Sequence, residues 1–76
     1  MTNLRRARVL KEFTQFHLGQ KTGIPQSRIS LLENGLIATE GEKTALARAL
    51  GCRVGELFPS QEPGGEAGVT QASVNP

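Results

Sequence analysis

The sequence lacks several residue types on which catalytic and metal sites are usually built. It contains no aspartate, tyrosine or tryptophan, and it has one histidine and one cysteine. Cys52 has no partner for an internal disulfide, and with His17 as the sole imidazole no zinc or calcium site can be assembled. A nucleophile paired with a base is missing for the same reason. We therefore expect no metal, no cofactor, no small-molecule ligand and no enzymatic activity.

Long hydrophobic runs are also absent. No apolar stretch approaches the roughly 20 residues that a membrane-spanning helix needs. The N-terminus, which begins Met1-Thr2-Asn3-Leu4-Arg5-Arg6, lacks the apolar segment of a signal peptide. We expect a soluble cytoplasmic protein without a membrane partner.

The length of 76 residues, of which 37% are hydrophobic and 21% charged, leaves room for one small domain. The composition changes at Pro59. Residues 60–76 are rich in proline, glycine and serine, and two valines are their only sizeable apolar side chains. The sequence therefore predicts a folded domain at 1–59 and a disordered tail at 60–76.

Within the domain, apolar spacing and breaker residues predict five short helices and no strand. Asn3 is expected to cap the first helix, whose apolar side would consist of Leu4, Ala7 and Leu10. The other helices are expected at 15–22, from Pro25 to the stop at Gly35, at 40–50 and at 53–58. Thr14 suits the N-cap of the second helix, and Gly23 suits its left-handed end. The fold class is thus an all-α, compact five-helix bundle.

Positive charge is concentrated in the N-terminal half of the chain. The formal net charge is only +2, but residues 1–35 hold six lysines and arginines against two glutamates. The charges of residues 36–59 balance. A basic half is a weak indication of a polyanionic partner, and an ordinary solvated surface remains the alternative.

Residues 14–35 combine two short helices with a tight glycine turn between them. Helices joined so closely must cross steeply, and the side chain at the crossing, Gly19, must then be very small. The expected apolar interface of the pair consists of Leu18, Ile24, Ile29 and Leu32. This arrangement braces the second helix so that its outer face can enter a DNA major groove.

The ordered combination resembles the Cro/CI-type helix-turn-helix family of bacterial and phage regulators, also called the xenobiotic-response-element family. The matching residues are Thr14-Gln15, Gly19, Gly23, Ile29-Ser30, Glu33-Asn34-Gly35, Ala47, Ala49-Leu50-Gly51 and Glu56-Leu57-Phe58. The resemblance covers about residues 3–59. It implies a lambda-repressor-like fold of five helices and a sequence-specific transcription factor that binds double-stranded DNA, often as a dimer on inverted repeats.

The candidate base contacts lie on the third helix. A helical projection places Ile29, Leu32 and Glu33 on one side, with the opposite side and its flanks formed by Gln26, Ser27, Arg28, Ser30, Leu31 and Asn34. The resemblance implies base contacts at 26, 27 and 31, with 28 nearby. Their chemistry fits, since glutamine pairs with adenine, arginine with guanine or phosphate, and leucine with the thymine methyl group. We predict Gln26, Ser27, Arg28 and Leu31 as base-contacting residues, although Leu31 fits a stray exposed leucine equally well.

Three further residues take roles from the resemblance. Gln15, at the start of the second helix, matches a position that contacts phosphate beside the free amides of the helix N-terminus. Arg8 and Glu33 match positions that the family often joins in a largely buried ion pair between the first and third helices. Their expected role is structural.

The chain also departs from the family pattern. Phe16 stands where a small or polar residue is usual, and it either covers Phe13 or marks a contact surface. Thr22 replaces an aliphatic residue. The segment 36–39 is about one residue shorter than is common, which leaves the register of the fourth helix and the dimer surface open.

Two functional hypotheses follow. The first is a transcription regulator associated with the nucleoid, a repressor that occludes its operator as a homodimer, because no effector-binding domain is visible beyond residue 59. The second is the antitoxin or interaction module of a toxin–antitoxin pair, with the tail folding on a protein partner. The operator and the choice between repression and activation stay open at this stage.

Overall fold

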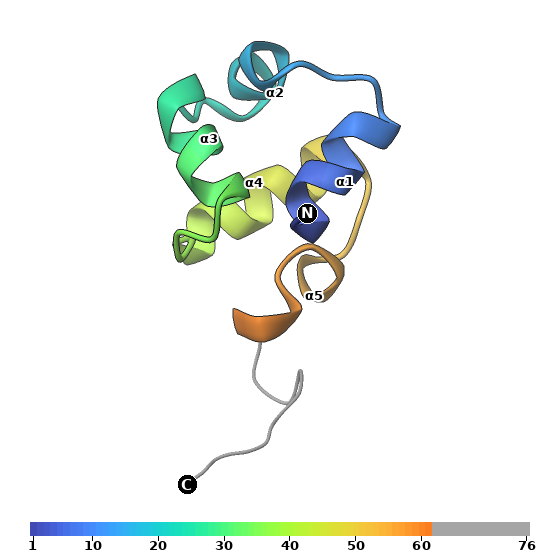
Figure 1. Cartoon of the computed structure of the whole chain (residues 1–76), viewed down its shortest axis with the longest axis vertical. Coiled ribbons are helices and arrows are strands. Elements are labelled where there is room, and N and C mark those ends of the chain that lie inside the picture. Colours follow the sequence, from blue (N-terminus) through green and yellow to red (C-terminus); the bar gives the residue numbers. More distant parts are fainter. Residues whose placement is uncertain (62–76) are drawn as a thin grey trace, which may run out of the picture.

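The structure, a computed structural model, describes residues 1–61, which contain five α-helices, one 3₁₀ turn and no strand. The elements are α1 Asn3–Leu10, α2 Gln15–Thr22, α3 Gln26–Glu33, α4 Glu40–Leu50, α5 Val54–Leu57 and η1 Pro59–Gln61. Figure 1 shows α2 and α3 at one end of the molecule and α5 with η1 at the other. The predicted all-α fold of five helices is confirmed.

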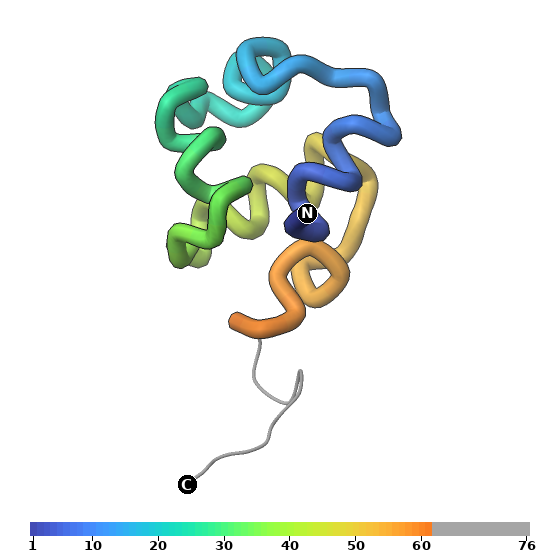
Figure 2. The backbone as a smooth tube through the Cα atoms, in the orientation of Figure 1, coloured from blue at the N-terminus to red at the C-terminus, as the bar shows by residue number. Residues whose placement is uncertain are grey.

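The helices pack around one shared core. Helix α4 contacts α2 and α5, α1 contacts α3 and α5, and α2 contacts α3. Each helix therefore packs against at least two others. The backbone tube in Figure 2 runs from the N-terminal helix through α2 and α3 and back across the molecule in α4 to α5 and η1 at the opposite end. The buried residues of the core are Leu4, Leu18, Ile24, Ile29, Leu32, Ala38, Leu46, Ala47, Leu50, Leu57 and Phe58.

Threonine side chains begin three of the helices. The hydroxyl groups of Thr2, Thr14 and Thr39 each accept a hydrogen bond from the N–H three residues later, at 3.2, 3.0 and 3.1 Å. Such caps satisfy amides that have no carbonyl partner within the helix. In α4 the Glu42 carboxylate also accepts the Thr39 N–H at 2.9 Å, which completes a capping box.

The first helix differs from its prediction in two respects. Thr2, not Asn3, is the N-cap, and the Asn3 amide instead donates to the Glu56 carbonyl oxygen at 2.8 Å. The Thr2 hydroxyl is better placed because it also donates to the Glu33 carbonyl oxygen at 2.9 Å. Leu10, which was expected on the apolar side of this helix, is 77% exposed, whereas Leu4 is fully buried in the core.

The predicted bounds of α2 and α4 are confirmed, which also settles the register of the fourth helix. Helix α3 begins one residue later than expected, because Pro25 takes an extended conformation with ψ of 145° and acts as the N-cap. It ends at Glu33, followed by Gly35 with a left-handed φ of 106°. Arg53 and Phe58 are the caps of α5 and not part of the helix.

The folded part of the chain continues slightly beyond the predicted domain end at residue 59. Pro59–Gln61 form η1, and the Gln61 side chain bonds the backbone of Ala38 in both directions, from Nε2 to the carbonyl oxygen at 3.1 Å and from the Ala38 N–H to Oε1 at 3.3 Å. Ser60 and Gln61 thus belong to the helical unit. The rest of the predicted tail, residues 62–76, lies outside the described residues.

The crossing of α2 and α3 leaves no room for a side chain at Gly19. A Cβ atom there would lie 2.7 Å from the Ile24 carbonyl oxygen, which belongs to the backbone and has little freedom to move. Gly41 in α4 is a matched glycine, since a Cβ atom at Gly41 would have no neighbour within 4 Å.

We therefore expect Gly19→Ala to lower the melting temperature. Alanine improves helix propensity by about 1 kcal/mol, but overpacking at the crossing costs about 1–3 kcal/mol. Gly41→Ala should leave the melting temperature unchanged or raise it. Thermal unfolding followed by circular dichroism measures both variants. A Gly19→Ala protein that melts at the same temperature as Gly41→Ala would contradict the tight crossing.

Candidate nucleic-acid interface

The turn between α2 and α3 is closed by backbone and hydroxyl hydrogen bonds. The N–H of Gly23, which has a left-handed φ of 79°, donates to the Gly19 carbonyl oxygen at 2.8 Å. The Thr22 hydroxyl donates to the Leu18 carbonyl oxygen at 2.8 Å and accepts the Ile24 N–H at 3.2 Å. Thr22, which departs from the family pattern, thus fixes the turn through polar contacts where an aliphatic residue would pack.

The outer face of α3 presents the predicted base-contacting residues to solvent, with one exception. Gln26, Ser27 and Leu31 are exposed, Leu31 to 55%, and the opposite face of the helix is buried in the core. Arg28 lies on the flank that faces α4 and is only partly exposed. The structure thus brings three of the four residues together on one open surface.

Arg28 is joined to Glu42 of α4 by a bidentate ion pair. Its Nε donates to Oε2 at 2.6 Å and its Nη2 donates to Oε1 at 3.0 Å, and the two side chains are 36% and 16% exposed. Sequence analysis missed Glu42 as a neighbour of the site. The threonine three residues before Glu42 indicates a capping box, but nothing local in the sequence indicates a pairing 14 residues back.

The ion pair changes the acidity of Glu42. Hydrogen bonds from the Arg28 guanidinium lower the pKa of Glu42 from 4.5 to about 2, against an opposing effect of burial, and the Thr39 N–H adds to the lowering. The ionised carboxylate is therefore favoured in the folded state. This contribution to stability is fully present above the unfolded pKa of 4.5 and is lost as the pH falls toward 2.

We expect the free energies of unfolding of the wild type and of Glu42→Gln to converge as the pH is lowered. The glutamine variant has no carboxylate to protonate, whereas the wild type loses the ionised pair. Urea unfolding at pH 5, 4 and 3 measures the difference between the two proteins. A difference that stays constant over this range would contradict the lowered pKa of Glu42.

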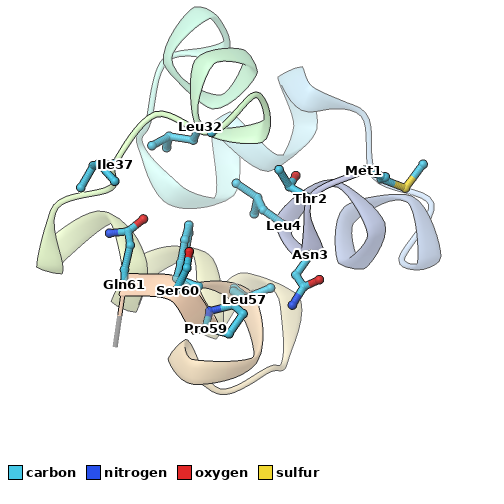
Figure 3. Close-up of a pocket in the computed structure, with 12 residues that line it drawn as sticks. Met1, Thr2, Asn3, Leu4, Leu32, Ile37, Leu57, Pro59, Ser60 and Gln61 are labelled. Carbon is cyan, nitrogen blue, oxygen red and sulfur yellow. The ribbon is translucent and has the colours of Figure 1, made fainter. Parts of the chain in front are cut away.

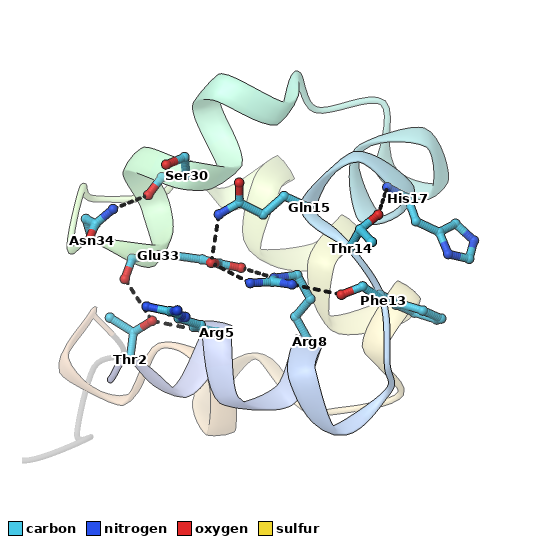
Figure 4. A network of polar contacts seen from close by, with 10 residues as sticks. All are labelled: Thr2, Arg5, Arg8, Phe13, Thr14, Gln15, His17, Ser30, Glu33 and Asn34. Atoms are coloured by element: carbon cyan, nitrogen blue, oxygen red, sulfur yellow. Dashed lines mark hydrogen bonds and ion pairs between the residues drawn. The ribbon is translucent and has the colours of Figure 1, made fainter.

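A second ion pair connects α1 to α3 in the interior. The guanidinium of Arg8 contacts the Glu33 carboxylate through Nε and, at 3.2 Å, through Nη2, and the two side chains are 13% and 3% exposed. Nη1 of Arg8 also donates to the Phe13 carbonyl oxygen at 2.8 Å. Figure 4 shows Arg8 between the Glu33 carboxylate at the end of α3 and the Phe13 carbonyl oxygen. The ion pair implied by the family resemblance is thus present, and its structural role stays a prediction.

Gln15, the predicted phosphate contact, belongs to the same network. Its Nε2 donates to Oε1 of Glu33 at 3.0 Å, so that the first residue of α2 is linked to the last residue of α3 (Figure 4). The side chain is half-buried. An amide nitrogen has two hydrogens, and one of them remains for a further acceptor.

We expect Arg8→Ala to destabilise the fold by about 3–5 kcal/mol, because it leaves the Glu33 carboxylate buried without its counter-ion. Arg5 is the matched control, since its side chain on the same helix is exposed. Arg5→Ala should change stability by less than about 0.5 kcal/mol. Urea unfolding measures both, and an Arg8→Ala protein as stable as Arg5→Ala would contradict the structural role of the pair.

The aromatic residues of this region occupy different surroundings. The ring beside Phe13 is that of His17, at 4.8 Å between centroids, and the Lys21 ammonium lies 5.4 Å from the Phe13 ring centre. Phe16 is 59% exposed and borders a hollow next to Gln26. Of the two alternatives for Phe16, its exposure favours a contact surface.

Another hollow lies at the α5 end of the molecule, among Met1, the loop after α3 and η1. Figure 3 shows residues that line it, including Leu4, Leu32, Ile37 and Leu57, and its volume is about 220 Å³. Ile37 is 68% exposed at its rim. Residues 1–61 contain no cluster of three side chains that would hold a metal ion, and none of their helices is long and apolar enough to cross a membrane.

A helix-turn-helix whose second helix is braced from behind and open on its outer face defines the class of a DNA-binding domain. A model of the helix-turn-helix family of Cro/CI type matches residues 4–57, and the chain belongs to this family. Neither the curated proteins nor the solved structures gave a match to the chain. The family consists of DNA-binding transcription regulators, which are generally not enzymes.

Proposed function

We propose that the protein is a repressor that recognises a specific DNA duplex by inserting α3 into the major groove and acts by occluding its operator. The observation that carries this proposal is the exposed face of α3 with Gln26, Ser27 and Leu31. The helix is held on its buried side by the Arg8–Glu33 ion pair and by the Gly19 crossing. A rigid helix with short, polar and apolar side chains on its open face suits direct contact with base edges.

The base contacts follow from the chemistry of the side chains. The Gln26 amide suits the N6 and N7 atoms of adenine, and the exposed Leu31 side chain suits a thymine methyl group. Ser27, between them on the first turn, both donates and accepts. Arg28 adds the chemistry for guanine at the edge of the same face.

Gln15 is proposed to contact phosphate. Its second amide hydrogen and the first amides of α2 are available to an anion, because the Thr14 hydroxyl satisfies only the N–H of His17. The contact to Glu33 orients the Gln15 side chain before DNA arrives. Such a contact fixes the position of the domain on the duplex without selecting a base sequence.

The protein is further proposed to bind inverted repeats as a homodimer, with half-sites about 10 base pairs apart or a multiple of this spacing. Exposed apolar side chains in the loop after α3 support self-association, since Leu36 is 40% and Ile37 is 68% exposed. Ile37 borders the hollow of Figure 3, at the end of the bundle that holds α5.

Selection of binding sites from a random duplex library tests this function. A palindromic consensus is the expected result, and a reporter promoter that carries the consensus should be silenced in the presence of the protein. Equally weak binding to every duplex would contradict the proposal and favour the protein-interaction module instead.

We expect Gln26→Ala and Gln15→Ala to weaken binding in different ways. Gln26→Ala should reduce preference at one base position by roughly 1–3 kcal/mol. Gln15→Ala should weaken binding to all duplexes similarly, and because the Gln15 amide carries no charge, it should leave the slope of log K against log salt unchanged. Titrations of the selected site and its single-base variants at several salt concentrations measure both effects.

Melting curves serve as the control, because Gln15→Ala also removes a hydrogen bond to buried Glu33. Binding is compared at a temperature where each variant is folded. Identical behaviour of the two variants would show that the division into phosphate and base contacts is wrong.

A further inference from the structure

Glu42 is an unusually constrained carboxylate for a residue so close to the exposed face of α3. Its two oxygens accept from Nε of Arg28 at 2.6 Å, from Nη2 of Arg28 at 3.0 Å and from the Thr39 N–H at 2.9 Å. Its position in the first turn of α4 is fixed by the capping box. The carboxylate therefore holds the Arg28 guanidinium in one plane and one orientation.

The contact uses one edge of the guanidinium and leaves the other edge open. Arginine has five N–H donors, of which two are occupied by Glu42. The three remaining donors are both hydrogens of Nη1 and one of Nη2, which form the end of the group. One hydrogen from each nitrogen forms a parallel pair, which matches the O6 and N7 acceptors of guanine in the major groove.

We propose that Glu42 is a positioning residue that presents the free edge of Arg28 to guanine and so sets the specificity of the domain at one base position. The inference rests on the proposed function, that α3 lies in the major groove. Arg28 is in the first turn of α3, next to Ser27 and one turn before Leu31. Its side chain is 36% exposed to solvent, beside the exposed Ser27.

Two physical effects favour this role over a simple clamp between α3 and α4. A free arginine loses side-chain entropy when a base immobilises it, and an arginine held beforehand has already lost it. The carboxylate also offsets the charge of Arg28, which reduces its attraction to any nearby phosphate and leaves the paired donors of its free edge for a base. An arginine that is held by a bidentate carboxylate is therefore selective for guanine, whereas an arginine without such a partner would also bind any nearby phosphate.

The test compares Arg28→Ala, Arg28→Lys, Glu42→Gln and the double variant Arg28→Ala/Glu42→Gln. Glutamine at 42 still accepts hydrogen bonds in a capping box, so that α4 keeps its N-terminus. Glu12→Gln is the charge control, because Glu12 is exposed on the turn after α1. Dissociation constants are measured on the duplex selected by the wild type and on duplexes with each G·C pair replaced by A·T.

The wild type is expected to prefer guanine at one position of each half-site. Arg28→Ala and Arg28→Lys should lower this preference roughly ten-fold to one-hundred-fold, since a lysine has no parallel pair of donors. Glu42→Gln should lower the preference at the same position by about two-fold to ten-fold, the cost of ordering one long side chain. In the background of Arg28→Ala, Glu42→Gln should change no base preference, and Glu12→Gln should change none in the wild type.

Other outcomes overturn the proposal in recognisable ways. Tighter binding of Glu42→Gln to all duplexes would show that Glu42 masks Arg28. Lower melting temperatures with unchanged base preferences would show a structural clamp alone. If the wild type selects a consensus in which no guanine depends on Arg28, the inference fails and the proposed function stands, whereas the absence of any consensus overturns both.

Discussion

The structure depends above all on the pairing of Arg8 with Glu33. Glu33 is the last residue of α3 and only 5% exposed, so that its charge is tolerable only with partners close by. Arg8 supplies the counter-ion from α1, and Gln15 adds a hydrogen bond from the start of α2. Three helices therefore meet at one carboxylate. The orientation of α3, and with it the direction of its open face, follows from this convergence.

The face of α3 that is open to solvent is the part of the helix that makes no contact with α1, α2 or α4. Helix α2 approaches so closely that Gly19 has no space for a side chain. The Arg8–Glu33 pair fixes the C-terminal end of α3, and the Arg28–Glu42 pair fixes its flank toward α4. Since α3 has only eight residues and little helical stability of its own, these tertiary contacts maintain it as a rigid element.

The electrostatics of the surface differ from what the count of charges indicates. The N-terminal half carries an excess of basic residues, but Arg8 and Arg28 are neutralised by Glu33 and Glu42. The basic residues of this half that remain exposed are Arg5, Arg6, Lys11 and Lys21. Attraction to a polyanion thus comes from these side chains, while the two paired arginines are held in defined positions. A charge count cannot distinguish the exposed basic residues from the paired arginines, because each ion pair joins residues that are far apart in the sequence.

The sequence by itself determined that the domain has five helices, and local signals such as the Thr14 cap, the left-handed Gly23 and apolar spacing predicted the bounds of α2 and α4. It also determined the buried interface of α2 and α3 and, through the family resemblance, the Arg8–Glu33 pair. Only the tertiary structure decided that Thr2 caps α1, because its hydroxyl also reaches the Glu33 carbonyl oxygen of another helix. It alone decided that Gln61 bonds to Ala38 and that Glu42 binds Arg28. These contacts join residues far apart in the chain, whose distance is set by the packing of the whole bundle.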